Sequence, residues 1–134
     1  MDARRKIADI DIDGLPHLGS GITWEYEGRQ VLATPNIRKA EISIIDMQTW
    51  KTIKRIETLG PGFFMRSHEN SRYAWAGVFF GPNKDAVHII EKSTLEIVRT
   101  LRPEPGKTAA HVEFDKDGKH ALLSIWEHDG AVIV

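Results

Sequence analysis

The sequence predicts an all-β fold, a partial β-propeller, and two observations support this prediction. The segment IIDMQTWKTIKRI at residues 44–56 returns about 45 residues later as IIEKSTLEIVRTL at residues 89–101, with apolar and turn positions in step. Short segments with alternating apolar and polar side chains recur along the chain, and no longer stretch shows a helical period. A period of about 40 to 50 residues built from such strands is the signature of propeller blades.

Twelve strands are expected, each bounded by turn residues. They cover residues 7–12, 21–24, 30–34, 40–46, 52–58, 62–67, 73–79, 86–91, 97–102, 110–114, 120–125 and 130–134. The turns at residues 27–29, 70–72 and 116–119 each contain Gly, Asn or Asp, which tolerate the positive φ of a tight hairpin. Each of these turns is expected to join the innermost strand of a blade to the next strand.

These strands amount to about three four-stranded blades. Propellers close with roughly four to eight blades, and an open run of blades leaves unpaired sheet edges and an exposed face of the core. We therefore expect residues 1–134 to be part of a single propeller domain, in a chain that is truncated at both ends.

The composition argues against several classes of function. The 134 residues carry a formal net charge of -1, which argues against a nucleic-acid partner. No apolar stretch approaches the roughly 18 residues of a membrane span, and the start of the chain lacks the apolar core of a secretory signal. Cysteine is absent, so this chain offers no disulfide, no thiolate metal site and no C-x-x-C-H motif for covalent c-type haem.

Three of the six histidines fall at or near the expected innermost strands, which line the channel of a propeller: His17, His68 and His111. Arg66 lies two residues before His68, so the alternation of a strand predicts that both point to the same side. An imidazole coordinates iron or transfers a proton, and a guanidinium binds a carboxylate, so together they suit an anionic cofactor with a redox centre. A core histidine at position 111 and a tight glycine turn around position 17 remain alternatives.

The other histidines and the tryptophans have structural interpretations. Structural roles are expected for His88, His120 and His128. Trp50 occupies the repeat position of Leu95 and is expected to pack between blades. Packing in the core is favoured over covering a flat macrocycle for Trp24, Trp75 and Trp126.

A resemblance to a known family rests on four segments, at residues 15–21 (LPHLGSG), 62–71 (GFFMRSHENS), 105–114 (PGKTAAHVEF) and 124–126 (SIW). They resemble the haem d1-binding, eight-bladed propeller of the cytochrome cd1 nitrite reductase family. This family includes the reductase of denitrification and its relatives in haem d1 biosynthesis. The resemblance runs through the whole chain and implies the latter part of such a propeller, with haem d1 or its dihydro precursor as the tetrapyrrole ligand.

The resemblance also implies roles for individual residues. His68 matches a histidine on the distal face of haem d1, and it is the expected catalytic residue and metal ligand. Arg66 takes the place of a basic residue beside it and is expected to hold a propionate. Further cofactor contacts are expected from His17, Glu69, Asn70 and His111. The proximal iron ligand is expected from a blade outside these residues.

The nitrite reductases use a second distal histidine, and none occurs near residues 33–36 (ATPN), where it is expected. The resemblance therefore implies an oxidoreductase of the dihydro-haem d1 dehydrogenase type, in which His68 removes a proton while electrons pass to a c-type haem. It implies a periplasmic location, a possible c-type cytochrome partner, and a c-type haem only in an upstream domain. Two alternatives remain: a nitrite reductase that makes nitric oxide, and a non-enzymatic propeller scaffold that binds proteins.

Overall fold

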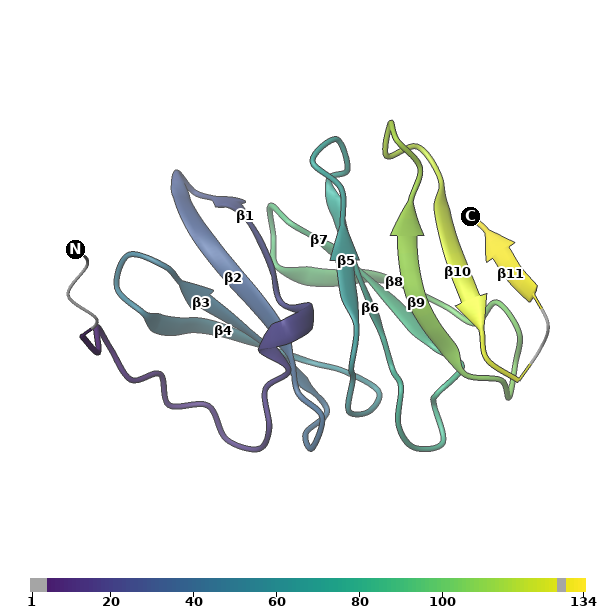
Figure 1. Ribbon diagram of the computed structural model, residues 1–134, viewed down its shortest axis with the longest axis horizontal. Coiled ribbons are helices and arrows are strands. Elements are labelled where there is room, and N and C mark those ends of the chain that lie inside the picture. The colour runs from purple at the N-terminus through teal and green to yellow at the C-terminus, as the bar shows by residue number, and fades with distance from the viewer. Residues whose placement is uncertain (1–4, 128–129) are drawn as a thin grey trace.

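Three antiparallel sheets stand side by side in the computed structural model, which describes residues 5–127 and 130–134 (Figure 1). The first blade contains β1 (Ile22–Tyr26), β2 (Arg29–Pro35), β3 (Glu41–Asp46) and β4 (Lys51–Glu57). The second contains β5 (Met65–Ser67), β6 (Tyr73–Gly77), β7 (Val87–Glu91) and β8 (Glu96–Leu101). The third contains β9 (Ala109–Phe114), β10 (Ala121–Ile125) and β11 (Gly130–Ile133). Strand order within each sheet follows the chain, which confirms the all-β, propeller-type prediction.

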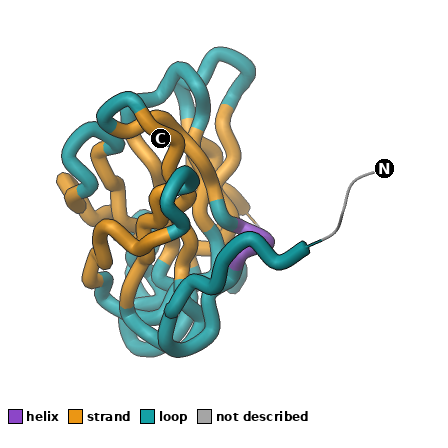
Figure 2. Tube along the Cα trace, turned by 90° about the vertical axis from the view of Figure 1, so that its left-hand side faces the viewer, coloured by secondary structure: helices purple, strands orange, loops and turns teal. Residues whose placement is uncertain are grey.

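The first strand of each blade lies innermost. Strand β5 lies against β1 on one side and β9 on the other. A turn of 3₁₀-helix, η1 (Leu18–Ser20), precedes β1 and lies near the start of that strand (Figure 1). Viewed from the side, the strands occupy the middle of the molecule and loops lie at both of their ends (Figure 2). Among the described residues, no helix has the length and hydrophobicity needed to cross a bilayer.

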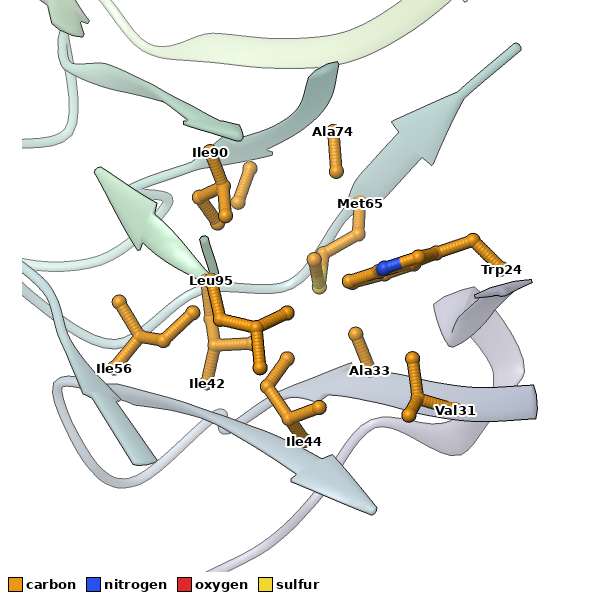
Figure 3. Packing of buried hydrophobic residues seen from close by; sticks show 11 residues of the cluster. Trp24, Val31, Ala33, Ile42, Ile44, Ile56, Met65, Ala74, Ile90 and Leu95 are labelled. Atoms are coloured by element: carbon orange, nitrogen blue, oxygen red, sulfur yellow. The ribbon is translucent and has the colours of Figure 1, made fainter. Parts of the chain in front are cut away.

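Two apolar clusters hold the blades face to face. The cluster between the first and second blades contains Trp24, Val31, Ala33, Ile42, Ile44 and Ile56 from one blade, and Met65, Ala74, Ala76, Ile90 and Leu95 from the other (Figure 3). The second cluster joins the second and third blades and includes Trp75, Val87, Ile89, Val112 and Leu123. Burial of these side chains is the main stabilising term between blades.

The tryptophans divide between these clusters and the surface. Trp24 and Trp75 are each 7% exposed, as expected for core residues, and the indole N–H of Trp24 donates to the carbonyl of Lys92 in the next blade. Trp126 is 56% exposed, so the expectation of a core position for it was wrong. Trp126 follows the last residue of β10, where the chain leaves the sheet for a surface loop, and no blade covers it among the described residues.

The sequence repeat has a matching backbone repeat. Trp50 and Leu95 adopt φ values of 56° and 57°, and their N–H groups donate to the carbonyls of Asp46 and Glu91 at 2.8 and 2.9 Å. Each residue therefore closes an equivalent turn in its own blade. A non-glycine residue at positive φ is uncommon, and the left-handed conformation costs roughly 1–2 kcal/mol. Leu95 nevertheless keeps a side chain there, because that side chain is buried in the cluster between blades.

An ion pair repeats in the same way. The Arg29 guanidinium contacts the buried Asp46 carboxylate at 2.7 Å, and in the second blade Arg72 pairs with Glu91, the residue that takes the place of Asp46. The Arg29 guanidinium and the N–H groups of Gln48 and Thr49 hold the pKa of the Asp46 carboxyl below its usual value. The pair joins β2 to β3 at the end of the blade that carries the β3–β4 turn.

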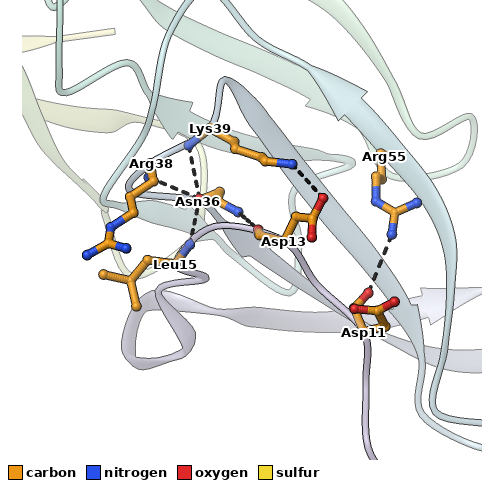
Figure 4. Close-up of polar contacts among 7 residues, drawn as sticks. All are labelled: Asp11, Asp13, Leu15, Asn36, Arg38, Lys39 and Arg55. Atoms are coloured by element: carbon orange, nitrogen blue, oxygen red, sulfur yellow. Dashed lines mark hydrogen bonds and ion pairs between the residues drawn. The ribbon is translucent and has the colours of Figure 1, made fainter.

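The strand expected at residues 7–12 is absent. No ladder hydrogen bonds form there, Ile7 is 79% exposed, and the contact drawn in Figure 4 is a 3.4 Å hydrogen bond from the Arg55 guanidinium to the Asp11 carbonyl. Alternating side chains form a strand only where a neighbouring strand offers backbone partners. Among the described residues, no strand lies beside this segment in register, so its alternation alone does not produce a ladder.

Asn36 ties the segment before β1 to the β2–β3 connection. Its side chain is buried and bonds four backbone groups, which are the N–H groups of Leu15, Arg38 and Lys39 and the carbonyl of Asp13 (Figure 4). Gly14, at φ 84°, packs so closely that a Cβ there would lie 2.7 Å from the Asn36 Oδ1. The His17 N–H then donates to the Pro35 carbonyl at 2.8 Å, which sets the start of η1.

Candidate functional site

The innermost strands border two cavities that adjoin each other. One, of about 220 Å³, is lined by His17, Ser20, Phe64, Arg66, His111 and Glu113, among others, and is called the Arg66 cavity here. The other, of about 580 Å³, is lined by Thr23, Glu25, Gln30, Ser67, His68, Glu69 and Lys92, among others, and is called the His68 cavity. Gly21 and Ile22 line both, so the two cavities meet at the start of β1.

His17 is held by the loop that precedes β5. Its Nδ1 lies 2.8 Å from both the Ser20 hydroxyl and the Phe63 carbonyl. A carbonyl only accepts hydrogen bonds, so Nδ1 carries the proton and Nε2 of the neutral ring keeps its lone pair. The ring also packs on the Phe63 ring, with 4.0 Å between their centroids. His17 therefore offers an acceptor nitrogen to a ligand.

Arg66 pairs with a carboxylate from the next blade. Its Nε and Nη2 lie 3.1 and 3.0 Å from the same Glu113 oxygen, and both side chains are more than half exposed. Exposed pairs of this kind contribute about 0–1 kcal/mol, so exchanging Glu113 for a ligand carboxylate costs little. Sequence reasoning missed Glu113, although its place two residues after His111 predicts that it shares the exposed face of β9.

His111 is exposed, which removes the alternative of a core histidine. Its backbone N–H donates to the Ser124 hydroxyl at 3.1 Å, and its ring packs on Phe64 with 4.0 Å between centroids. Phe64 in turn contacts Phe63, and Phe79 links both phenylalanines to the exposed Trp126. A continuous series of ring contacts therefore connects His17, which precedes β1, with His111 on β9.

His68 lies outside the strand that was expected to carry it. Strand β5 ends at Ser67, and the chain turns at His68, whose carbonyl accepts from the Ser71 N–H at 3.0 Å. Arg66 and His68 line different cavities, although both lie against the third blade, Arg66 at Glu113 and His68 at Gly118. The expectation that both point to the same side of the strand stays a prediction. The alternation of a strand fixes side-chain direction only while the chain remains extended, and β5 ends one residue before His68.

The contacts of the His68 ring indicate which of its two nitrogens carries the proton when the ring is neutral. The Asn70 N–H donates to His68 Nδ1 at 3.1 Å, so the neutral ring carries its proton on Nε2. Glu69 is exposed and lines the His68 cavity. Asn70 is not among the residues that line either cavity, and its side-chain amide donates to the Asp117 carbonyl of the third blade at 3.3 Å.

Lys92 is a cation of this site that sequence reasoning missed. Its Nζ donates to the carbonyls of His68 and Ser71 at 3.0 and 2.6 Å. Burial lowers the pKa of this ammonium from its ordinary value. The signal in the sequence is a departure from the repeat, since Lys92 stands where the first blade has Met47.

The remaining histidines have the structural roles expected of them where the structure describes them. His88 is buried and bonded through both ring nitrogens. His120 pairs with Asp115 at 2.8 Å, and this contact lowers the pKa of the Asp115 carboxyl to about 2. His128 lies outside the described residues.

No group of three or more His, Asp and Glu side chains is arranged to hold a metal ion within residues 5–127 and 130–134. A single axial imidazole needs no such group, so the role expected of His68 as a metal ligand stays a prediction. The same holds for the cofactor contacts expected from Arg66, His17, Glu69, Asn70 and His111.

Two proteins of Pseudomonas aeruginosa are similar to this chain in sequence. The dihydro-heme d1 dehydrogenase of Pseudomonas aeruginosa is 55% identical over 100% of this chain, and Protein NirF of the same organism is 29% identical over 86% of it. The chain spans 27% and 28% of the lengths of these two relatives.

Two solved structures are similar to this chain in fold. The structure of dihydro-heme d1 dehydrogenase NirN in complex with DHE matches 95% of this chain, and the chain spans 28% of it, with a TM-score of 0.92 and 56% identity. The structure of hydrazine synthase of Kuenenia stuttgartiensis matches 77% of this chain, with a TM-score of 0.65, and the match covers 29% of the hydrazine synthase chain. The sequence identity is 19%, so this match supports the fold alone.

The family model described as the Cytochrome D1 heme domain matches residues 1–134, which is the full length of the chain. The three-blade architecture and the residues that border its innermost strands are in keeping with that match. The chain belongs to the cytochrome d1 haem domain family.

Proposed function

We propose that this chain forms part of a haem d1-binding redox propeller of the dihydro-haem d1 dehydrogenase type. One observation carries the proposal: Arg66, His17 and His111, from three different blades or their connections, line one cavity that adjoins the cavity of His68. The 55% identity to the dihydro-heme d1 dehydrogenase supports this type of oxidoreductase. The activity belongs to the whole protein, of which this chain supplies the residues described here.

The described residues fit an anionic tetrapyrrole. Among the described residues, the partner of Arg66 is an exposed carboxylate, so its guanidinium is available for a bidentate contact with a propionate. The rings of Phe64 and His111, which are tilted by 41° to each other, present π-faces of the kind that pack against a flat macrocycle. His17 offers an acceptor nitrogen and His68 an N–H donor, so the polar edge of a ligand finds both kinds of partner.

The chemistry requires a group that accepts a proton. When bound, dihydro-haem d1 supplies the propionate whose oxidation to an acrylate releases two electrons and two protons. We assign one of these protons to His68 and the other to solvent water, while both electrons leave for the c-type haem named below. The lone pair of its neutral ring is on Nδ1, which now accepts the Asn70 N–H, so proton uptake at Nδ1 requires that contact to open.

The region where a nitrite reductase needs its second histidine supports this choice. Asn36 is 1% exposed there and makes four hydrogen bonds to the backbone. These bonds give Asn36 a structural role, and an amide side chain has no acidic proton to give to a ligand. The dehydrogenase type, which relies on one histidine of this chain, agrees better with the structure.

In this proposal the electrons pass to a c-type haem, carried by another part of the protein or by a c-type cytochrome. It lies outside these 134 residues, because they contain no cysteine for its attachment. The corresponding location is the periplasm, where c-type cytochromes operate in the family that the chain resembles.

The test replaces His68 in the protein that carries this chain. His68→Ala is expected to alter the absorbance spectrum of bound dihydro-haem d1 and to lower turnover by about 100-fold or more, as for loss of a proton-transfer group. His120→Ala is the matched control, because that imidazole is exposed and paired with Asp115 on the third blade. Unchanged spectrum and turnover in His68→Ala would refute the role of His68. Lack of any tetrapyrrole affinity in the folded protein would favour the scaffold.

A further inference from the structure

The ring of His68 packs closely against the backbone of the third blade. Gly118, in the β9–β10 hairpin, lies so close that a Cβ at this position would be 2.7 Å from the His68 Cγ and 3.1 Å from its Cβ. Real Cβ atoms do not come this near to a ring atom, so the approach is possible only for glycine. The φ of Gly118, 70°, also belongs to the region that glycine adopts most readily.

The two hairpin tips are also linked by a hydrogen bond of Asn70. The Asn70 amide donates to the Asp117 carbonyl at 3.3 Å, one residue before Gly118. The Asn70 N–H donates to His68 Nδ1. The third blade therefore contacts both the imidazole and the residue that holds its Nδ1.

Lys92 supports the same turn from within the second blade. Its ammonium bonds the carbonyls of His68 and Ser71, the first and last residues of the turn. Its own carbonyl accepts from the Trp24 indole, which anchors the lysine backbone to the first blade. The turn that presents His68 is thus held by contacts that involve all three blades.

We propose that Gly118 and Lys92 are positioning residues for His68. Gly118 limits the rotation of the ring by its close approach, and Lys92 keeps the turn closed, so that the imidazole keeps one orientation and only the Asn70 contact has to open when Nδ1 takes up the proton. The inference rests on the proposed function, because it assigns the two residues to the proton chemistry of His68. Neither residue touches the reacting atoms, and both act through the imidazole.

The first measurement compares two glycines in the protein that carries this chain. Gly118→Ala adds a methyl group against the ring at φ 70°, whereas Gly28→Ala adds one at φ 77° in the β1–β2 hairpin, where nothing lies within 4 Å. Both changes carry the backbone cost of alanine at positive φ, so their difference isolates the contact with His68. Gly118→Ala is expected to lower turnover by about 10- to 100-fold, as misplacement by about 1 Å does, and Gly28→Ala is expected to leave turnover unchanged.

The second measurement asks whether the loss acts through His68. In a double-mutant cycle with His68→Ala, Gly118→Ala is expected to add no further loss, because the group that it displaces is already gone. An equal loss in the two backgrounds would overturn the proposal, as would full activity of Gly118→Ala. If His68→Ala alone retains full activity, the proposed function fails, and the cycle reports this separately.

A readout without turnover completes the test. In the ligand-free protein, ¹⁵N chemical shifts of the His68 ring distinguish the nitrogen that carries a proton from the one with a lone pair. We expect the Nε2–H tautomer in the parent protein and in Gly28→Ala, and a mixture of tautomers in Gly118→Ala. Lys92→Met, which removes the two carbonyl contacts without adding atoms near the ring, is expected to give the same mixture. An unchanged tautomer in both Gly118→Ala and Lys92→Met would overturn the proposal, and if Gly118→Ala does not fold, Lys92→Met decides alone.

Discussion

At the residue scale, His88 shows how a histidine inside a propeller blade is stabilised in its neutral form. Its side chain is 2% exposed, its Nε2 accepts from the Leu59 N–H at 3.1 Å, and its Nδ1 lies 2.8 Å from the Thr100 hydroxyl. Because Nε2 accepts, Nδ1 carries the proton and donates it to Thr100. Burial, with a smaller contribution from Arg102, lowers the pKa of His88 to about 4.

The lowered pKa predicts a pH dependence of stability. The unfolded chain binds a proton at His88 below its ordinary pKa, about 6.5, whereas the folded chain resists protonation down to about 4. The stability that His88 contributes is therefore complete above pH 6.5 and is lost as the pH falls toward 4. Denaturant unfolding at these two pH values should show a loss on the order of 2 kcal/mol that His88→Gln abolishes. An equal loss in the variant would contradict this.

At the element scale, the β7–β8 turn combines a strained backbone with a buried side chain. Leu95 has a φ of 57° and is 2% exposed within the cluster that joins the first two blades. Leu95→Ala keeps the unfavourable φ, so the backbone cost is the same before and after the substitution. The change in stability therefore reports the packing of the side chain between blades.

Leu95→Ala is expected to lower the free energy of unfolding by about 2–5 kcal/mol, as for a leucine removed from a well-packed core. Val98→Ala is the control, because Val98 lies on the neighbouring strand β8 and is 49% exposed. That control should change stability by less than about 0.5 kcal/mol. Equal effects of the two substitutions, measured by denaturant unfolding, would mean that the turn contributes no packing between blades.

At the scale of the whole molecule, the third blade has a face that no other strand of the described residues covers. Leu122 on β10 is 46% exposed and lines a cavity of about 470 Å³ with Glu113, Phe114, Asp115 and His120. Propeller blades are stabilised by neighbours on both faces, as the two apolar clusters show for the second blade. An apolar face without a neighbour favours association between molecules.

The isolated 134-residue chain is therefore expected to self-associate, and Leu122→Lys is expected to reduce this association by placing a charge on this face of the third blade. Val98→Lys, at a residue of similar exposure on β8, is the control and should have a smaller effect. Light scattering during size-exclusion chromatography measures the mass. A monomeric parent chain with a cooperative melt would contradict the expectation.

Much of the fold followed from local patterns. The blade repeat aligned Trp50 with Leu95, and both residues do close equivalent turns at nearly equal φ. The Glu27–Gly28 turn also forms as expected, with both residues at positive φ. Patterns failed where a neighbour was needed: residues 7–12 alternate but have no adjacent strand to complete a ladder, and Trp126 has no covering blade among the described residues.

The sequence by itself determined the all-β class, the blade period, the family, and which histidines lie near the innermost strands. Those properties depend on the order of residues along the chain, which periodicity and motifs record directly. The tertiary structure alone decided that Arg66 and His68 line separate cavities, that Glu113 pairs with Arg66, and that Gly118 and Lys92 hold the His68 turn. These contacts join residues about 24 to 50 positions apart in sequence, and they exist because packing of the blades brings separate hairpin tips together.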